Sequence, residues 1–394
     1  MKKIIIILLL FALIAGCAKQ EVEKAGIQLP ADALSEGKTQ PEEVPEIPPE
    51  EMSEEKTEEL KEENIQKEIP KITTITNPLN VPRVNTAAHF VINEEGFVEE
   101  EDSPALCYLG AFAMLALYDD SSLDLADVIA YSGIGVAASY DSRAGLLNKY
   151  KEKSIILAAQ NLGYDFVLGV KSGGKANSHL ASFTPSASKV KYFKDEEEAF
   201  NHLKQIIDSG KPAEVHLDIY YVIDDFRKIS EMWVNSWDKG HYSHFMAVTG
   251  YDDNYVYIND PTDPDLGIKN MKTPVKNFLE AWKNGDKVTG AQLGPYWMLY
   301  INKKSNKKSV NDIISWDKEI SSDSASQIRK ASRGDSGELG VGRKEFSQFL
   351  ERNSYKEAAK LYQESVEIYL QDPEENKYFQ QIADKEEQAR GLLK

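Results

Sequence analysis

Cysteine is nearly absent from this chain, which has only two such residues, Cys17 and Cys107, in 394 positions. If Cys17 is modified during export, Cys107 has no partner for an internal disulfide. An unpaired cysteine in an exported protein is either a buried, inert side chain or a reactive thiol. The two interpretations differ in whether other residues of the chain could activate the Cys107 thiol.

An excess of basic residues is also absent. The chain has 46 Lys and Arg against 64 Asp and Glu, and its formal net charge is −18. This balance excludes a nucleic-acid partner, because phosphate binding needs clustered cations. The six histidines and two cysteines lack the close spacing of metal ligands, apart from His241 and His244. We therefore expect neither a metal nor a cofactor.

Long apolar runs are missing except at the N-terminus. Residues 4–14 form an apolar run that follows Lys2 and Lys3 and is too short to cross a bilayer as a helix. The run ends in Ile14-Ala15-Gly16-Cys17, which resembles the lipobox of prokaryotic lipoproteins. In that family the cysteine is acylated, and two or more acyl chains give stable anchoring. We expect a lipoprotein signal peptide over 1–16 and a lipid anchor at Cys17 on the extracytoplasmic face of the cell membrane; an ordinary cleaved signal peptide is the alternative.

The composition divides the rest of the chain into three regions. Residues 17–76 are poor in aromatic side chains and rich in Glu, Lys and Pro, a composition that cannot bury enough apolar surface to fold. We interpret them as a disordered tether. Residues 77–304 have a globular composition and form the predicted main domain. Residues 305–394 are polar and helical, and we interpret them as a small C-terminal α-helical appendage that could bind a protein partner.

The apolar pattern of the main domain predicts helices first and then a sheet, an α+β arrangement. The predicted helices cover 103–118, 123–132, 146–162, 196–209 and 275–284. The predicted strands cover 212–221, 243–250, 255–260 and 296–303. In the C-terminal region the predicted helices cover 324–332, 343–352, 355–371 and 374–393.

Cys107 lies in the first turn of the helix that Ser103-Pro104 is predicted to start. A cysteine is a weak nucleophile until it is ionised. A helix N-terminus lowers the pKa of a thiol, and a neighbouring histidine lowers it further by forming an ion pair. The histidine then protonates the leaving group, while a carboxylate or amide orients the imidazole.

The predicted hairpin at 243–260 supplies a histidine and a carboxylate. If Asp252-Asp253-Asn254 is a three-residue turn, Val248 lies opposite Ile258, and Asp260 is a diagonal neighbour of His244. A two-residue turn would place His244 and Asp260 on opposite faces. The register that buries the apolar residues is therefore the register that builds a His–Asp pair. The alternative is a surface hairpin in which both residues merely end strands.

These residues carry a resemblance to a known family. The segments 243–252 (SHFMAVTGYD) and 256–261 (VYINDP) resemble the His/Asp segment of papain-like cysteine peptidases of the bacteriocin-processing, or double-glycine, type. Residues 106–111 resemble the cysteine helix of that family less closely. The resemblance implies a papain-like cysteine peptidase fold and a Cys107–His244–Asp260 triad acting on a peptide or amide substrate.

A second resemblance is to the N-terminal domain of butirosin biosynthesis protein H. It rests on the segment 216–221 (HLDIYY), on Gly133-Ile134-Gly135-Val136, and on the helical tail around 340–350. That family is linked to acyl transfer through a cysteine rather than to proteolysis. The resemblance therefore implies a cysteine acyltransferase as an alternative activity.

One position departs from the peptidase pattern. The peptidases place a Gln about six residues before the cysteine as a donor to the oxyanion, whereas this chain has Glu99-Glu100-Glu101-Asp102 there. Loss of one such donor typically costs about 10²- to 10³-fold in rate. The departure keeps open a third alternative, a non-catalytic surface binding protein on an inactive peptidase scaffold.

Three aromatic or imidazole side chains are candidates for the wall of a substrate site. His241 and Trp237 belong to the loop before His244, and Tyr108 follows Cys107. The alternative for His241 is a loop residue that only packs among aromatic side chains.

Overall fold

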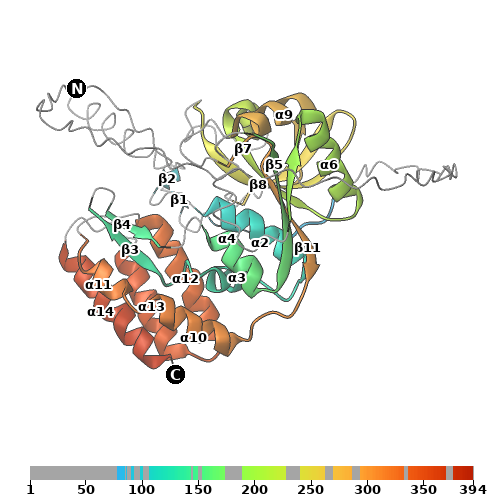
Figure 1. Cartoon of the computed structure of the whole chain (residues 1–394). Coiled ribbons are helices and arrows are strands. Elements are labelled where there is room, and N and C mark those ends of the chain that lie inside the picture. The colour runs from blue at the N-terminus through green and yellow to red at the C-terminus, as the bar shows by residue number, and fades with distance from the viewer. Residues whose placement is uncertain are drawn as a thin grey trace, which may run out of the picture. The chain divides into compact units, whose positions relative to one another are not determined.

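The computed structural model describes the residue ranges 78–84, 86, 90–92, 98–100, 106–142, 145–149, 153–173, 189–227, 240–261, 269–285, 293–331, 336–369 and 376–393. These residues belong to one compact unit (Figure 1). The predictions of a signal peptide, a lipid anchor at Cys17, a tether over 17–76 and a helix start at Ser103 lie outside the described residues. The side chains of 99–102 also lie outside them.

A seven-stranded mixed sheet forms the centre of the main domain, in the order β10-β9-β8-β7-β11-β5-β6. Every neighbouring pair is antiparallel except β5 with β6, which is parallel. Its strands are β5 Tyr164–Lys171, β6 Lys189–Phe193, β7 Ala213–Asp218, β8 Ser243–Tyr251, β9 Tyr255–Asn259, β10 Met271–Pro274 and β11 Met298–Lys304. Two further strand pairs are β1 Phe90–Ile92 with β2 Val98–Glu100, and β3 Ala138–Asp141 with β4 Gly145–Asn148.

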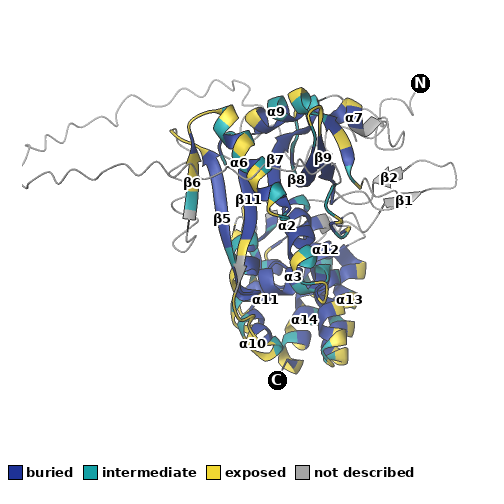
Figure 2. Cartoon of the chain, turned by 90° about the vertical axis from the view of Figure 1, so that its right-hand side faces the viewer, coloured by how far each residue is buried: buried dark blue, intermediate teal, exposed yellow. Residues whose placement is uncertain are grey.

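Helices cover both faces of this sheet. Alternation along β11 shows the two layers, since Met298 and Tyr300 pack with α6 and α9 while Leu299 and Ile301 pack with α2, α3 and α4. Buried residues follow the central strands, and exposed residues line the outer sides of α6 and α9 (Figure 2). These helices are α2 Cys107–Asp119, α3 Leu125–Ser132, α4 Ser154–Asn161, α6 Glu196–Asp208 and α9 Val275–Asn284, with the short η2 Ile219–Tyr221 and α7 Ile223–Arg227 after β7.

The C-terminal region continues the core on the α2 side of the sheet. Phe346, Phe349 and Tyr362 belong to the same buried cluster as Phe112 of α2 and Tyr131 of α3. The region consists of α10 Val310–Ile320, α11 Ser324–Ile328, α12 Ser336–Arg352, α13 Lys356–Tyr369 and α14 Asn376–Leu392. Within the described part of the chain, no helix combines the length and the apolar character needed to span a membrane.

The structure confirms most of the predicted elements and corrects others. α6, α9, β8 and β9 lie within one or two residues of the predicted bounds. The predicted helix over 146–162 is wrong in its first half, where β4 precedes α4. Pairing with β3 overrides the helix-forming composition there. The strand predicted over 212–221 ends at Asp218, and β3, β5, β6, β10 and α10 were missed.

Candidate active site

The hairpin of β8 and β9 has the predicted register but not the predicted turn. Val248 pairs with Ile258 as expected. The turn, however, has only two central residues, because the Asp252 N–H donates to the Tyr255 carbonyl at 2.8 Å. A β-bulge between Val248 and Gly250 shifts the register back by one residue. A two-residue turn alone would place His244 and Asp260 on opposite faces of the sheet. The extra residue of the bulge shifts the register by one and returns the two side chains to the same face.

The bulge residue is Thr249, which is fully buried. Its hydroxyl donates to the Asn270 side-chain oxygen at 3.0 Å, and the Tyr257 carbonyl lies 3.3 Å away. Those contacts satisfy a polar side chain that the bulge turns inward. They fix the kink of β8, whose opposite end carries His244.

His244 and Asp260 form a buried pair at that strand end. Nε2 of His244 lies 2.9 Å from Oδ1 of Asp260, and the two side chains are 6% and 2% exposed. Burial disfavours the imidazolium. The Asp260 carboxylate and the Cys107 sulfur, which hydrogen-bonds the ring, outweigh that cost and raise the pKa of His244 to about 10. Because Nε2 is held by Asp260, Nδ1 is the nitrogen left for the thiol.

Cys107 is the first residue of α2. It is partly exposed and is the free cysteine of the described residues. The first helical N–H to find an intrahelical carbonyl is that of Gly110, which donates to Leu106 at 2.8 Å. The N–H groups of the first turn around Cys107 therefore point out of the helix end, as at any helix N-terminus. This end of the helix favours negative charge on the sulfur and on a nearby oxyanion.

β7 places a row of ionisable side chains beside this centre, and the sequence interpretation missed it. Glu214, His216 and Asp218 alternate with apolar residues and are each at most 1% exposed. Both carboxylate oxygens of Glu214 are buried without a hydrogen-bond partner among the described residues. Burial, and secondarily the nearby Cys107, raise the pKa of Glu214 well above its usual value. The alternating pattern Glu-Val-His-Leu-Asp within a buried strand was the available signal.

His216 links this row to His244. Its Nε2 contacts the Ser243 hydroxyl, while its Nδ1 is buried without a partner among the described residues. Its ring packs against Phe245 in a tilted arrangement, with centroids 4.7 Å apart. Burial and the neighbouring His244 lower the pKa of His216 to about 3, so this ring is neutral beside the charged one.

The candidates for a substrate wall lie in different environments. Nδ1 of His241 lies 2.6 Å from Oδ2 of Asp218, and the imidazole is 56% exposed and stacked on Tyr220 at 4.3 Å. The structure corrects the prediction that Tyr108 lines a substrate site, because this side chain is only 7% exposed and belongs to the core. As the second residue of α2 it points into the interior and presents little surface to a substrate. Trp237 lies outside the described residues.

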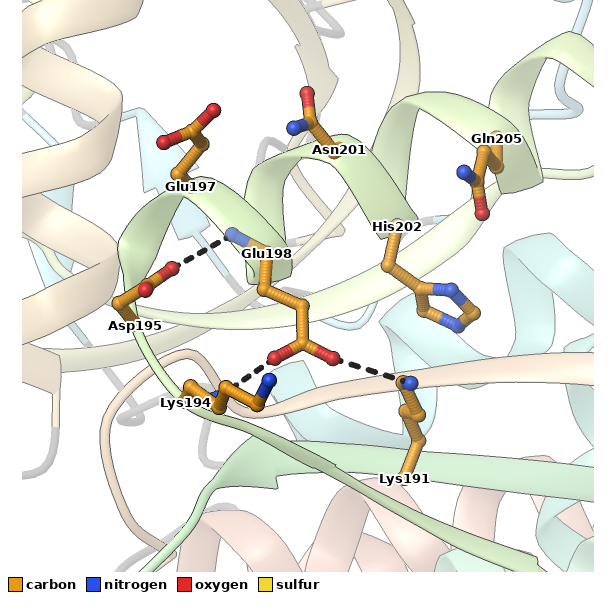
Figure 3. A pocket seen from close by; sticks show the side chains of 8 residues that line it. All are labelled: Lys191, Lys194, Asp195, Glu197, Glu198, Asn201, His202 and Gln205. Atoms are coloured by element: carbon orange, nitrogen blue, oxygen red, sulfur yellow. Dashed lines mark hydrogen bonds and ion pairs between the residues drawn. The ribbon is translucent and has the colours of Figure 1, made fainter.

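A surface hollow of about 460 Å³ lies beside β6 and α6 (Figure 3). Within it, Glu198 accepts from the Lys194 N–H at 2.9 Å and pairs with Lys191 at 3.2 Å. None of its lining residues belongs to the Cys107–His244–Asp260 group. Such exposed ion pairs contribute little energy, and the hollow brings together no reactive constellation.

Metal ligands are not gathered anywhere in the part of the chain that the structure describes, where no group of three His, Cys, Asp or Glu side chains could hold an ion. The candidate site itself brings together a thiol, an imidazole and a carboxylate.

Parts of the chain are similar to known proteins. Over 40 residues the chain is 58% identical to the Uncharacterized protein YvpB of Bacillus subtilis, which is 10% of this chain and 14% of that protein. A solved structure from Bacillus anthracis, described as a C39-like peptidase, aligns over 58% of this chain and 100% of its own length, with 16% identity and a TM-score of 0.33. The model of the Peptidase_C39 like family matches residues 78–289, more than half of the chain. The chain therefore belongs to the Peptidase_C39 like family.

Proposed function

We propose that this protein is a papain-like thiol hydrolase, a cysteine peptidase that cleaves peptide or amide bonds on the extracytoplasmic face of the cell membrane. The observation that carries the proposal is the arrangement of three side chains. Cys107 begins α2 and hydrogen-bonds His244, whose opposite nitrogen lies 2.9 Å from Asp260. Membership of the C39-like peptidase family supports it.

In the first half of the reaction the Cys107 thiolate attacks the substrate carbonyl carbon. The His244 imidazolium donates its Nδ1 proton to the leaving amine as the C–N bond breaks, which leaves a thioester on Cys107 and a neutral imidazole. Asp260 keeps Nε2 protonated and the ring in place throughout. Positioned proton transfer of this kind contributes about 10² to 10⁴ in rate.

In the second half a water molecule attacks the thioester. His244 Nδ1 accepts a proton from that water, the C–S bond breaks, and the carboxylic acid product leaves. The thiolate then again faces an imidazolium. The oxyanion of each tetrahedral intermediate is stabilised by the Cys107 N–H at the N-terminus of α2, in place of the Gln that the sequence lacks.

The location of the enzyme follows from Cys17. The lipobox-like segment before it supports acylation of that cysteine, which anchors the chain to the membrane. A chain with Cys17→Ser should be released from membranes and should fail to incorporate radiolabelled palmitate. Palmitate incorporation by that variant would contradict the anchor at this position.

The direct test of the catalytic role is covalent labelling. An activity-based electrophile should modify wild-type chain at Cys107, and a Cys107→Ala variant should not be labelled at all. The same pair of proteins, exposed to a peptide library, should differ in the cleavage of at least one sequence. An unlabelled wild-type Cys107 would contradict the proposed function.

Two other functions remain as alternatives. The segment 216–221 and the similarity to butirosin biosynthesis protein H favour a cysteine acyltransferase, in which an amine rather than water would take the acyl group. The acidic residues in place of the Gln favour a non-catalytic surface binding protein. That last function predicts that Cys107→Ala leaves ligand binding unchanged and that the wild-type chain cleaves no peptide.

A further inference from the structure

We propose that the C-terminal helices are part of the catalytic centre, because Glu338 of α12 positions Cys107 through Tyr108. This inference rests on the proposed function, since it takes Cys107 to be the nucleophile. It goes beyond that function by assigning a role to a region that the family model does not match, because the match ends at residue 289.

The contact between the two regions is a buried hydrogen bond. The Tyr108 hydroxyl donates to Oε1 of Glu338 at 2.7 Å, across 230 residues of sequence. Tyr108 is 7% exposed and Glu338 is 1% exposed. A buried hydrogen bond to a carboxylate is among the stronger kinds in proteins. Burial, and then Glu338, raise the pKa of Tyr108 well above its usual value, so the phenol stays a donor.

Tyr108 is connected to both halves of the site. It directly follows Cys107 on α2, and its ring packs edge to face on Phe245 with centroids 6.2 Å apart. Phe245 directly follows His244 on β8. A movement of the Tyr108 ring therefore changes the separation between sulfur and imidazole. A misplacement of about 1 Å can cost on the order of 10² in rate.

α12 is itself held in place by a second buried contact. Arg343 is fully buried, and its Nε lies 3.0 Å from Oε1 of Glu386 on α14. Its guanidinium also donates to the carbonyl of Val136 at 3.2 Å. A Cβ atom at Gly342 would lie 3.1 Å from the Ile134 carbonyl oxygen, so the helix approaches the 134–136 turn closely. Because Glu338 is on the same helix, these contacts also set the position of its carboxylate.

The test compares Glu338→Gln, Tyr108→Phe and the double variant in the full chain. The rate of alkylation of Cys107 by iodoacetamide is measured from pH 5 to pH 9, with the modified peptide identified by mass spectrometry. We expect Tyr108→Phe, which removes the donor, to lower the rate at pH 6 about tenfold. Glu338→Gln should lower the rate less, because its amide oxygen still accepts a weaker, uncharged hydrogen bond. The double variant should be no slower than Tyr108→Phe, which already lacks the whole contact.

A matched control comes from the same helix. Glu345 is also a buried carboxyl on α12, 7% exposed, but its charged surroundings are Lys344, Asp124 and Arg352. Glu345→Gln should leave the alkylation profile unchanged. If Glu338→Gln fails to fold, Tyr108→Phe carries the test, because it keeps the ring and removes only the hydroxyl.

A His244→Ala variant separates the two possible failures. If His244→Ala slows alkylation while Glu338→Gln and Tyr108→Phe match the wild type, the positioning role is overturned and the proposed function stands. If His244→Ala has no effect, the proposed function falls, and the positioning role falls with it. A loss in Glu345→Gln equal to that in Glu338→Gln would also overturn the inference, because the effect would then be a general one of α12.

Discussion

Two His–Asp pairs lie at the same end of β7 and β8, and their environments differ. His244 and Asp260 are 6% and 2% exposed, whereas His241 is 56% exposed on an Asp218 that is 1% exposed. His244 uses Nε2 for its carboxylate and His241 uses Nδ1. His244 thus presents Nδ1 to the Cys107 thiol, and His241 presents Nε2 to solvent.

The comparison shows that residue type alone does not set the environment of a His–Asp pair. A carboxylate beside an imidazole acts strongly only where water is excluded and a group to be deprotonated lies on the free nitrogen. The first pair has both conditions, and the second has neither. We therefore expect substitutions in the two pairs to have very different effects.

The largest difference should appear in thiol reactivity. In His244→Ala the alkylation rate of Cys107 at pH 6 should fall by about 10²-fold, since the imidazolium that would pair with a thiolate is lost. In His241→Ala the rate should stay within about twofold of the wild type. The alkylation rate is measured by mass spectrometry. If it fell equally in His244→Ala and His241→Ala, the two His–Asp pairs would not differ in their effect on Cys107.

The next effect concerns pH and stability. The pKa of His244 is raised to about 10, so its pairing with Asp260 stabilises the fold fully below the unfolded pKa near 6.5 and loses that effect as pH rises through 10. The stability advantage of wild type over Asp260→Asn should therefore shrink by about 1.4 kcal/mol per pH unit across that window.

Urea denaturation between pH 6 and pH 10 measures this change. Asp218→Asn is the matched control, because its imidazole partner is largely exposed. An advantage of wild type over Asp260→Asn that stays constant from pH 6.5 to pH 10 would rule out the ionic role of Asp260.

A third prediction concerns Glu214, whose carboxyl group is buried without a hydrogen-bond partner among the described residues. Glu214 is as buried as Asp260, but both of its oxygens lack a partner among the described residues. Glu214→Met should raise the free energy of unfolding by about 1–3 kcal/mol at pH 7, because an unsatisfied polar group leaves the core. Since the folded pKa of Glu214 is raised, the gain should grow as pH rises above the unfolded value near 4.3.

Glu214→Gln is the control for that measurement. It keeps an unpaired polar group of the same shape but cannot ionise, so it should show the same growth of the gain with pH. It should lack the part of the gain that comes from removing a buried polar group. A loss of stability in Glu214→Met would mean that the carboxyl has a partner in solution.

The smallest effect is expected at the exposed pair. His241→Ala should change the free energy of unfolding by about 0–1 kcal/mol, because the imidazole is 56% exposed and its charge is screened. The difference from wild type should decrease further between 0.05 M and 0.5 M salt. If His241→Ala lowered the free energy of unfolding by several kcal/mol at every salt concentration, the His241–Asp218 pair would be shielded from solvent as the His244–Asp260 pair is.

Local patterns predicted a large part of the fold and the site. Alternation along β8 and β9 predicted the register that pairs Val248 with Ile258, and apolar spacing predicted α6 and α9. The same patterns failed for 146–149, where helix-forming residues pair with β3. They also predicted the wrong turn, because a bulge at Thr249 compensates for a missing turn residue, and no local signal distinguishes the two arrangements.

The sequence by itself determined the family, the three residues of the candidate triad and their order, because those depend on residue type and on periodicity along single strands and helices. Tertiary structure alone decided which His–Asp pair is buried beside the thiol. It also decided that Glu214 lies unpaired near Cys107 and that Glu338, 230 residues from Tyr108, reaches the start of α2. The physical reason is that burial and long-range contacts arise only when distant segments pack, and they set the charge of each ionisable group.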